Sequence, residues 1–322
     1  MISRRTLLIA AAVSAPAIVH AQTAAWPTKP IRWIVNFPPA GAADIMSRAL
    51  AEWFGTKLGQ PIVVENKPGA GGMLGADIVA KAPADGYTIL VGTNSTNAAL
   101  KFLMKKLPYD QDTAFAPVAY MGSVPLIMAV NNDVPAKTLK ELVDMAKAKP
   151  GSINFASAST SQLVSTEMMA GMAGIQLSNV PYKSGPAAMT DLIGGVVQMF
   201  SADFAVMLPQ VKAGKVRGLA VTSSKRSPAV PELPTVNEAL GLKDYELIAY
   251  FAVFAPAGTP PDIVAKLNKA VNEAANSKEI QDRFAGIGFA VEPGTPADLA
   301  KRSVTETAKW AKAIKDAKIE PQ

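Results

Sequence analysis

The sequence predicts an α/β fold made of two lobes, in which strands and helices alternate. Apolar runs of strand length alternate with segments of helical periodicity along most of the chain. Gly and Pro are abundant and aromatic residues make up only 7%, which is typical of many short strand-to-helix turns. The 322 residues exceed what one hydrophobic core usually organises, so two lobes are expected.

Residues 1–21 have the features of an export signal. Two arginines supply a basic start, residues 7–13 are apolar, and Val19-His20-Ala21 offers a small-residue cleavage site. General secretory export and twin-arginine export both fit this pattern. The apolar run is too short for a membrane anchor, so we expect a mature chain that begins near Gln22 in a bacterial periplasm.

The composition excludes several kinds of chemistry. The only histidine, His20, lies in the expected leader, and the chain has no cysteine. Catalysis or zinc binding through these side chains is therefore excluded for the mature protein, and we expect no cofactor, no metal and no catalytic residue. The net charge of +6 falls to +4 without Arg4 and Arg5, and the lysines are dispersed. Nucleic acid is therefore not an expected partner.

The first part of the chain repeats a strand-helix unit three times. The apolar run 31–36 predicts a strand, and residues 44–58 predict a helix because Ile45, Ala49 and Phe54 share one face. By the same patterns, further strands are expected at 62–65 and 88–92, with helices at 74–81 and 97–104.

The remaining elements follow the same alternation, interrupted by an irregular, proline-rich connector at 224–234. Extended residues 119–130 and 245–254 are candidates to pass between the lobes, which predicts lobe 1 at 22–122 plus 251–322 and lobe 2 at 123–250. Strands are expected at 125–131, 153–156, 177–180, 197–201, 216–221 and 247–254, and helices at 138–148, 186–193, 261–276 and 296–317, with two more ending at 171 and 213.

Ligands of open α/β sheets bind at the carboxyl ends of strands, so the turns there are candidate sites. In the first turn, two prolines stiffen the loop and small residues leave the N–H groups of the next helix open to a carboxylate. Asp44 is expected to cap its own helix whether or not a ligand binds. The turn consists of Phe37, Pro38, Pro39, Ala40, Gly41, Ala42, Ala43 and Asp44.

Two further turns carry polar side chains. Four hydroxyls in five positions of the turn at 157–161 exceed what one helix cap needs, although one or two of them can serve as an N-cap box. For the turn that begins at residue 93, ordinary turn propensity explains the sequence equally well. These turns consist of Ser157, Ala158, Ser159, Thr160, Ser161 and Gln162, and of Thr93, Asn94 and Ser95.

Acidic residues offer alternatives. Asp203 follows the strand 197–201, where it can accept hydrogen bonds from a ligand amine or hydroxyl or cap the next helix. With Glu167 or Asp191 it could form the acid pair of a glycoside hydrolase, but a solvated surface role is commoner for those two. The glycine-rich run 69–75 lacks the spacing of a dinucleotide fingerprint, so we interpret it as a structural loop.

A series of motifs follows in order along essentially the whole mature chain: Trp26-Pro27-x-Lys29-Pro30-Ile31, Phe37-Pro38-Pro39 with Gly41 and Asp44, Val64-Glu65-Asn66-Lys67-Pro68-Gly69-Ala70-Gly71-Gly72, Ala82-Pro83-Ala84-Asp85-Gly86-Tyr87-Thr88, Leu107-Pro108-Tyr109-Asp110, Val180-Pro181-Tyr182-Lys183, Lys212-Ala213-Gly214-Lys215 with Ala220-Val221-Thr222, and Ala255-Pro256-Ala257-Gly258-Thr259-Pro260. Together these motifs resemble one family, the substrate-binding receptors of tripartite tricarboxylate transporters, often called Bug-type proteins.

The resemblance implies a two-lobed clamshell like that of type II periplasmic binding proteins, each lobe a mixed sheet flanked by helices. It implies a periplasmic receptor that holds a small carboxylate between its lobes and delivers it to membrane permease subunits. It implies contacts from residues 38–44 and 157–162. The ligand could be a di- or tricarboxylate, an amino acid or an aromatic acid. A ligand sensor for a membrane kinase, or a carboxylate- or serine-dependent hydrolase, remains an alternative.

The sequence departs from the family pattern within the expected site. Family loops commonly read Gly-Gly-Gly-Thr before the aspartate, where this chain has residues 40–43, Ala-Gly-Ala-Ala. The second loop is about two residues shorter, and Leu163 and Asn97 stand where histidine is frequent. These differences bear on which acid is bound.

Overall fold

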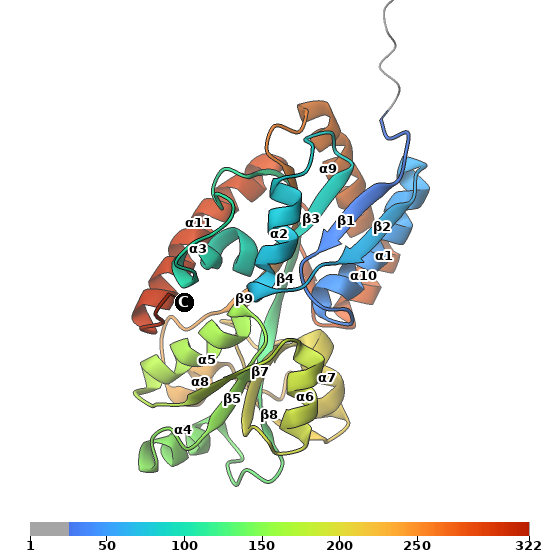
Figure 1. The fold of residues 1–322 in the computed structure, drawn as a ribbon. Coiled ribbons are helices and arrows are strands. Elements are labelled where there is room, and N and C mark those ends of the chain that lie inside the picture. The colour runs from blue at the N-terminus through green and yellow to red at the C-terminus, as the bar shows by residue number, and fades with distance from the viewer. Residues whose placement is uncertain (1–25, 322) are drawn as a thin grey trace, which may run out of the picture.

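Two β-sheets that share one long strand form the frame of the molecule (Figure 1). The structure is a computed structural model and describes residues 26–321. The expected leader at 1–21, with His20, lies outside the described residues. Among residues 26–321, no helix combines the length and apolar character that a bilayer crossing requires.

The sheet of lobe 1 has the order β2-β1-β3-β9-β4, with β10 also paired to β4. Strand β1 is parallel to β2 and β3, whereas β9 is antiparallel to both β3 and β4. The strands are β1 (Ile31–Val35), β2 (Ile62–Asn66), β3 (Thr88–Thr93), β4 (Phe115–Asn131), β9 (Ile248–Pro256) and β10 (Ala290–Val291).

Helices cover both faces of this sheet because its strands alternate apolar side chains between the two faces. Trp33 points to the face of α1, where its ring stacks on Phe54 at 5.3 Å between centroids, whereas Ile34 packs in the core on the other face. One face carries α1 (Ala42–Leu58), α9 (Pro261–Ala275) and α10 (Lys278–Ala285), and the other carries α2 (Met73–Ala80), the π-helix η2 (Ser95–Ala99), α3 (Leu100–Leu103) and α11 (Pro296–Asp316).

The sheet of lobe 2 contains β8, β4, β7, β5 and β6, in that order. Met128 of β4 packs into one core and Ile127 into the other, so this sheet too is covered on both sides. The strands are β5 (Asn154–Ser157), β6 (Ser178–Pro181), β7 (Met199–Asp203) and β8 (Val216–Val221), and the helices are α4 (Leu139–Ala148), α5 (Thr160–Ala173) and α8 (Val236–Leu240) on one face and α6 (Gly185–Ile193) and α7 (Phe204–Lys212) on the other.

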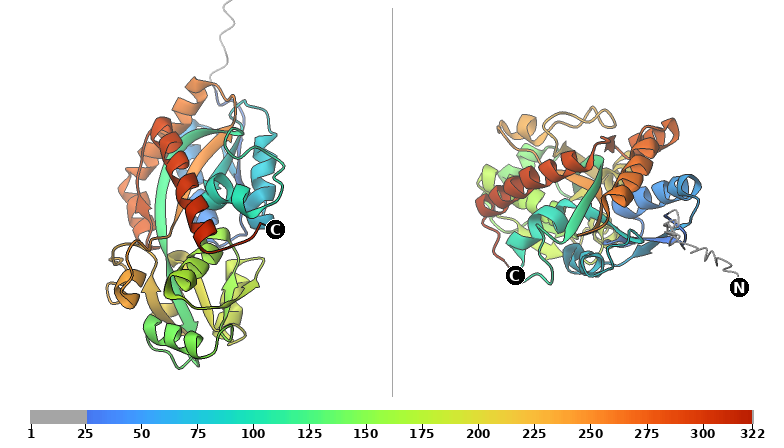
Figure 2. Two further views of the ribbon diagram at one scale, coloured as in Figure 1. Left: turned by 90° about the vertical axis from the view of Figure 1, so that its left-hand side faces the viewer. Right: turned by 90° about the horizontal axis from the view of Figure 1, so that it is seen from above.

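Strand β4 joins the lobes, because it pairs with β9 as far as Pro125 and with β7 from Leu126 onward. The helix α11 of lobe 1 also contacts α5 of lobe 2, and near that contact Lys309 lies 3.1 Å from Glu246 (Figure 2). The expected lobe boundaries at 22–122 plus 251–322 and at 123–250 stay a prediction.

Most expected elements are present, with shifted ends, but β4 is much longer than the strand expected at 125–131. Pro117, Gly122 and Pro125 interrupt its sequence pattern, and the pairing with β9 shifts register near the first two of them. The short helices α8 and α10, the one-turn segment η1 (Ala70–Gly72) and the two-residue β10 were not expected, because short elements carry little periodicity.

Thr222 ties together the strands that pass between the lobes. Its hydroxyl accepts a hydrogen bond from the N–H of Leu126 at 2.8 Å, and its own N–H donates to the Leu126 carbonyl at 3.0 Å. The Thr222 carbonyl accepts from the N–H of Leu247, one residue before β9, at 3.0 Å. Because Thr222 is fully buried, water cannot replace these partners.

We therefore predict that Thr222→Val lowers the free energy of unfolding by about 1–3 kcal/mol, since it leaves the buried N–H of Leu126 without an acceptor. Urea unfolding of the purified protein measures the change. Thr222→Ser keeps the hydroxyl and serves as the control, with a smaller expected loss. A loss for Thr222→Val no larger than that for Thr222→Ser, which lacks only the methyl group, would contradict the importance of this hydrogen bond.

Candidate functional site between the lobes

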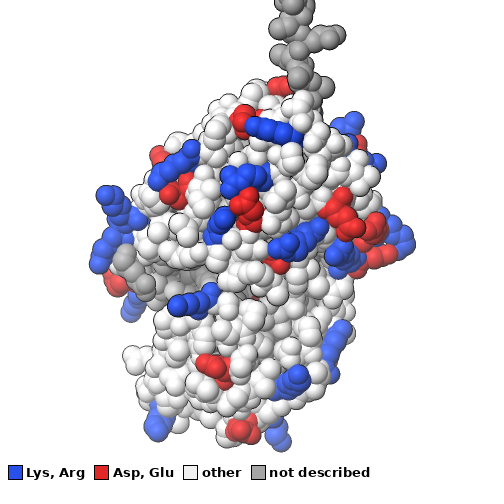
Figure 3. Space-filling view, turned by 45° about the vertical axis from the view of Figure 1, so that its right-hand side comes forward, with Lys and Arg blue, Asp and Glu red and all other residues white. Residues whose placement is uncertain are grey.

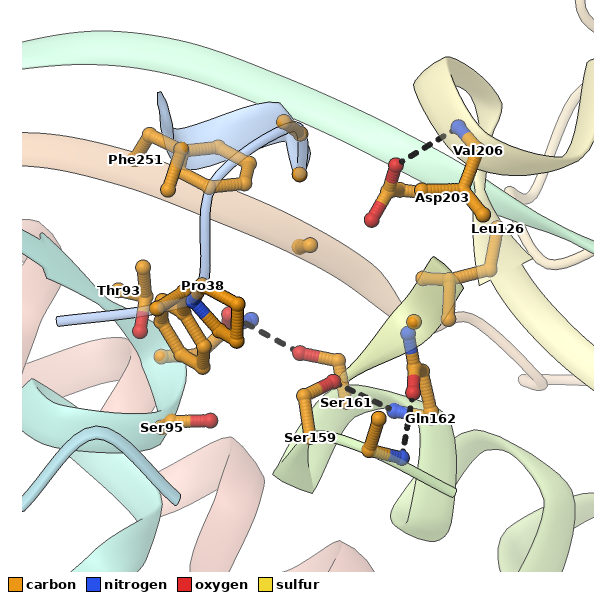
Figure 4. A pocket seen from close by; sticks show the side chains of 18 of the residues that line it. Pro38, Thr93, Ser95, Leu126, Ser159, Ser161, Gln162, Asp203, Val206 and Phe251 are labelled. Atoms are coloured by element: carbon orange, nitrogen blue, oxygen red, sulfur yellow. Dashed lines mark hydrogen bonds between the residues drawn. The ribbon is translucent and has the colours of Figure 1, made fainter. Parts of the chain in front are cut away.

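A pocket lies between the lobes where strands of both sheets end (Figure 4). Its empty volume is about 690 Å³ including the open mouth, of which about 70 Å³ admits the centre of a water molecule, so it suits a small molecule. Thirteen of the eighteen expected site residues line it: Phe37, Pro38, Gly41, Ala42, Ala43, Thr93, Asn94, Ser95, Ala158, Ser159, Ser161, Gln162 and Asp203.

The loop between β1 and α1 brings the start of a long helix to the pocket. Gly41 is the N-cap of α1, and no side chain caps the helix there. The first N–H groups of an α-helix have no partner within the helix, so those of Ala42 and Ala43 are available donors beside the pocket. This end of α1 also carries the positive end of the helix dipole.

Asp44 was expected to cap α1, but Gly41 is the N-cap and Asp44 is the third residue of the helix. Its carboxylate instead accepts hydrogen bonds that stabilise the loop outside the pocket. It accepts hydrogen bonds from the N–H of Ala40 at 3.0 Å, from Arg48 Nε at 2.9 Å and from Asn66 Nδ2 at 2.9 Å. Burial opposes the charge, but these donors outweigh it and hold the pKa of Asp44 below its usual value of 3.8. Pro39, Ala40 and Asp44 do not line the pocket.

The loop between β5 and α5 adds hydroxyls from lobe 2. Ser159 is the N-cap, with its hydroxyl accepting from the N–H of Gln162 at 3.4 Å, while Gln162 Oε1 accepts from the N–H of Ala158 at 2.7 Å. Ser159 and Ser161 line the pocket, but Ser157 and Thr160 do not. The Ser157 hydroxyl instead donates to Asn179 at 2.7 Å. The cap therefore occupies the Ser159 hydroxyl, and of the other three only that of Ser161 lines the pocket.

The turn expected at residue 93 is instead a direct passage from β3 into η2, with Asn94 alone between them, and it connects the two lobes at the pocket. Asn94 Nδ2 donates to the carbonyl of Ile248 at 2.8 Å, and Asn94 Oδ1 accepts from the Ser161 hydroxyl at 3.4 Å. The second of these bonds crosses from lobe 1 to lobe 2 and is drawn in Figure 4. Thr93 and Ser95 also line the pocket beside Asn94, so this turn has a place in the site beyond its turn propensity.

Sequence reasoning missed six residues of the pocket wall: Leu126, Gly185, Pro186, Val206, Ala249 and Phe251. Gly185 and Pro186 begin α6 after β6, so the rule that ligands bind at strand ends could have found them. Leu126 and Phe251 lie on β4 and β9, whose position beside the pocket depends on how the two sheets are joined.

Asp203 is the only acidic residue that lines the pocket within residues 26–321. It ends β7 and caps α7, and its Oδ1 accepts from the N–H of Val206 at 3.3 Å. Glu167 and Asp191 do not line the pocket, so no acid pair forms there. The Asp191 carboxylate instead accepts a hydrogen bond from the Tyr182 hydroxyl at 2.7 Å.

Charge on the described surface is mixed. On the face in Figure 3, basic and acidic side chains are interspersed, and many belong to ion pairs one helical turn apart, such as Lys81 with Asp77. Residues 26–321 contain no group of three or more His, Asp or Glu side chains suited to a metal ion. The glycine-rich run 69–75, expected to be a loop, instead forms η1 and the first turn of α2. It packs against the end of β1: a Cβ at Gly75 would lie 2.7 Å from that of Asn36, the residue after β1.

Two lobes with a small, largely apolar pocket that carries a few polar groups between them are the architecture of a solute-binding protein. The chain matches the model of the tripartite tricarboxylate transporter family receptor over residues 46–319 and belongs to that family, which confirms the resemblance found in its motifs. It is 38% identical to the protein BugT of Bordetella pertussis over 309 residues, covering 95% of this chain and 93% of BugT.

Solved structures confirm the two-lobed fold. Rpa4515 of R. palustris, solved with adipate, is 33% identical with a TM-score of 0.89, covering 92% of this chain and 100% of Rpa4515. MatC of Rhodopseudomonas palustris, solved with bound malate, is 32% identical with a TM-score of 0.85, covering 90% of this chain and 100% of MatC.

We predict that Asp44→Asn lowers the free energy of unfolding at pH 7 by about 1–3 kcal/mol, because the amide loses the charge that Arg48 and the Ala40 N–H stabilise. The lowered pKa of Asp44 stabilises the fold above its unfolded pKa near 3.8, and this contribution is lost as the pH falls through the lower folded value.

Urea unfolding at pH 7 and near pH 3 should therefore show a smaller difference between the two proteins at the lower pH. Asp262→Asn, at an exposed position 3.9 Å from Lys266, is the control and should change stability little. A difference for Asp44→Asn that does not depend on pH would contradict the role of the charge.

Proposed function

We propose that this protein is an exported receptor that binds a small organic carboxylate in the pocket between its lobes and delivers it to the membrane subunits of a tripartite tricarboxylate-type transporter. The main observation in support is that two helix starts, α1 from lobe 1 and α5 from lobe 2, meet at one pocket. Each presents backbone N–H donors, and α5 adds the hydroxyls of Ser159 and Ser161.

Such a site favours an anion without any fixed positive charge. Within residues 26–321, no lysine or arginine lines the pocket. Helix dipoles and N–H groups supply the positive potential, and hydrogen bonds to an ionised acceptor are stronger than neutral ones. A carboxylate fits this arrangement because its two oxygens can accept several donors at once. The ligands named for the structures of Rpa4515 and MatC, adipate and malate, support the same class for this chain.

The same contacts provide a transport mechanism. A ligand held by α1 and α5 together favours the conformation in which the lobes are closed, because only that conformation offers both sets of donors. The Asn94 bond to Ser161 already links the lobes at this point. Closure would then report occupancy to the permease, and the family of this chain supports that partner. The chemistry of the site requires no covalent step.

A thermal-shift screen against carboxylates tests the proposal. The panel should contain di- and tricarboxylates, amino acids and aromatic acids, each beside its neutral amide. A ligand that binds only the folded protein raises the melting temperature by mass action. We expect some acids to raise it and their amides not to do so. Turnover of a bound acid would favour a hydrolase, and equal shifts for acids and amides would contradict recognition of the carboxylate.

We predict that Ser159→Ala with Ser161→Ala weakens binding of an acid from this screen by about tenfold or more, because two donors to an ionised group are lost. Isothermal titration measures the affinity. Ser157→Ala with Thr160→Ala is the matched control, since these hydroxyls belong to the same turn but do not line the pocket. Unfolding of both variants in urea accounts for the loss of the Ser159 cap. Equal losses of affinity in the two pairs would contradict the assignment.

A further inference from the structure

The pocket holds one carboxylate of its own. Asp203 lies across the pocket from the hydroxyls of Ser159 and Ser161 (Figure 4). Its Oδ1 is used by the α7 cap, while its other oxygen faces the interior of the pocket in the same view. A site that favours an anion on one side thus carries an anionic group on another, and the function proposed above does not explain that group.

The comparison with Asp44 shows that this arrangement is unusual within the same protein. Asp44 is buried, and three donors including Arg48 compensate its charge. For Asp203, the N–H of Val206 caps the carboxylate at the longer distance of 3.3 Å, the N–H groups of Asp203 and Ala205 also act on it, and neither lysine nor arginine lines the pocket within residues 26–321. An ionised carboxylate in a confined site is costly unless it is paired, so the free protein leaves an interaction at Asp203 unmade.

Within residues 26–321, no other titratable group lines the pocket beside Asp203. Leu126 of β4 is its partner across the sheet, and Val206 of α7 and Ala249 and Phe251 of β9 complete the wall near it. Gly185 and Pro186 are the contributions of α6, and Gly41, Ala42 and Ala43 are those of the α1 start. The charged groups of the two neighbouring helices lie elsewhere, with Asp191 held by Tyr182 and Lys212 in the last turn of α7.

We propose that Asp203 determines ligand specificity by accepting a hydrogen bond from a donor group at the far end of the carboxylate ligand, so that the receptor prefers acids that also carry an ammonium or hydroxyl group. This inference rests on the proposed function. The ligand carboxylate occupies the side of Ser159 and Ser161, and its donor group meets the free oxygen of Asp203. A ligand with a second ionised carboxylate at that end meets a like charge instead.

The same geometry predicts a dependence on pH. Burial raises the pKa of Asp203 to about 6, although the N–H groups at the start of α7 act in the opposite direction. Below that pH the side chain is neutral and can donate a hydrogen bond to a second carboxylate. Above it, the charged side chain repels such a ligand and attracts an ammonium group. Dicarboxylates should therefore bind more tightly as the pH falls through about 6.

Matched ligands test the inference by isothermal titration. Succinate, 4-aminobutanoate and pentanoate each place a different group at the same end of one chain, and adipate, 6-aminohexanoate and heptanoate repeat the set at greater length. At pH 8 we expect the wild type to bind the amino acid of a set more tightly than the dicarboxylate by about tenfold or more. In Asp203→Asn this preference should fall to about threefold or less, since the amide carries no charge.

Two controls isolate the side chain. Asn is as good an N-cap as Asp, so Asp203→Asn keeps the cap of α7. Asp191→Asn removes an equal charge outside the pocket and should leave the ligand order unchanged. Each ligand's own protonation is the same for every protein, so the ratio of wild-type to Asp203→Asn affinity isolates Asp203. That ratio for the dicarboxylate should rise between pH 8 and pH 5.

The outcomes separate this inference from the function on which it rests. Binding of these acids with the same order and the same pH dependence in wild type and Asp203→Asn would overturn the inference and leave the carboxylate receptor standing. Failure of every acid in both sets and in the wider screen to bind either protein would contradict the receptor itself, and the inference with it. A loss of preference in Asp191→Asn as large as that in Asp203→Asn would also overturn the role of Asp203.

Discussion

The antiparallel pairing of β4 in both sheets is the constraint on which the site depends. In lobe 1, β4 and β3 are both antiparallel to β9, so β1, β3 and β4 run in the same direction, toward lobe 2. In lobe 2, β7 is antiparallel to β4, so β5 and β7 run back toward lobe 1. The carboxyl ends of β1 and β3 therefore face lobe 2 and those of β5 and β7 face lobe 1, so the helices that follow these strands begin at the cleft.

This topology fixes the electrostatics of the pocket before any side chain is chosen. Helix starts from both lobes supply N–H donors and the positive ends of dipoles, which are properties of the backbone. The sequence needs only small side chains at the helix starts, such as those of Gly41 and Ala42, so that the N–H donors stay uncovered. Where an acidic side chain would compete for these donors, its placement matters: Asp44 points behind the loop, whereas Asp203 enters the pocket.

The distinction between backbone properties and side-chain placement also explains how much of this structure the sequence predicts. Periodicity predicted β1 and α1 closely, because their apolar faces are regular, and the rule that ligands bind at strand ends located the three polar turns. The sequence could not show which hydroxyl in residues 157–161 faces the pocket, since the direction of each side chain depends on the helix beginning after Ser159. It also missed Leu126 and Phe251, because their position depends on pairing between strands more than 100 residues apart in the chain.

The division between backbone and side chains indicates where ligand choice resides. Donors that come from the backbone recognise any carboxylate and are preserved by most substitutions, so they define the class of ligand and not its identity. Discrimination between acids requires side chains that meet the remainder of the molecule, and a repulsive group contributes to it as much as an attractive one. In the binding mode proposed above, the remainder lies toward Leu126, Val206, Phe251 and Asp203, which line the pocket as three apolar groups and one carboxylate. Among these four only Asp203 can distinguish ligands by their charge, because the others differ only in size and shape.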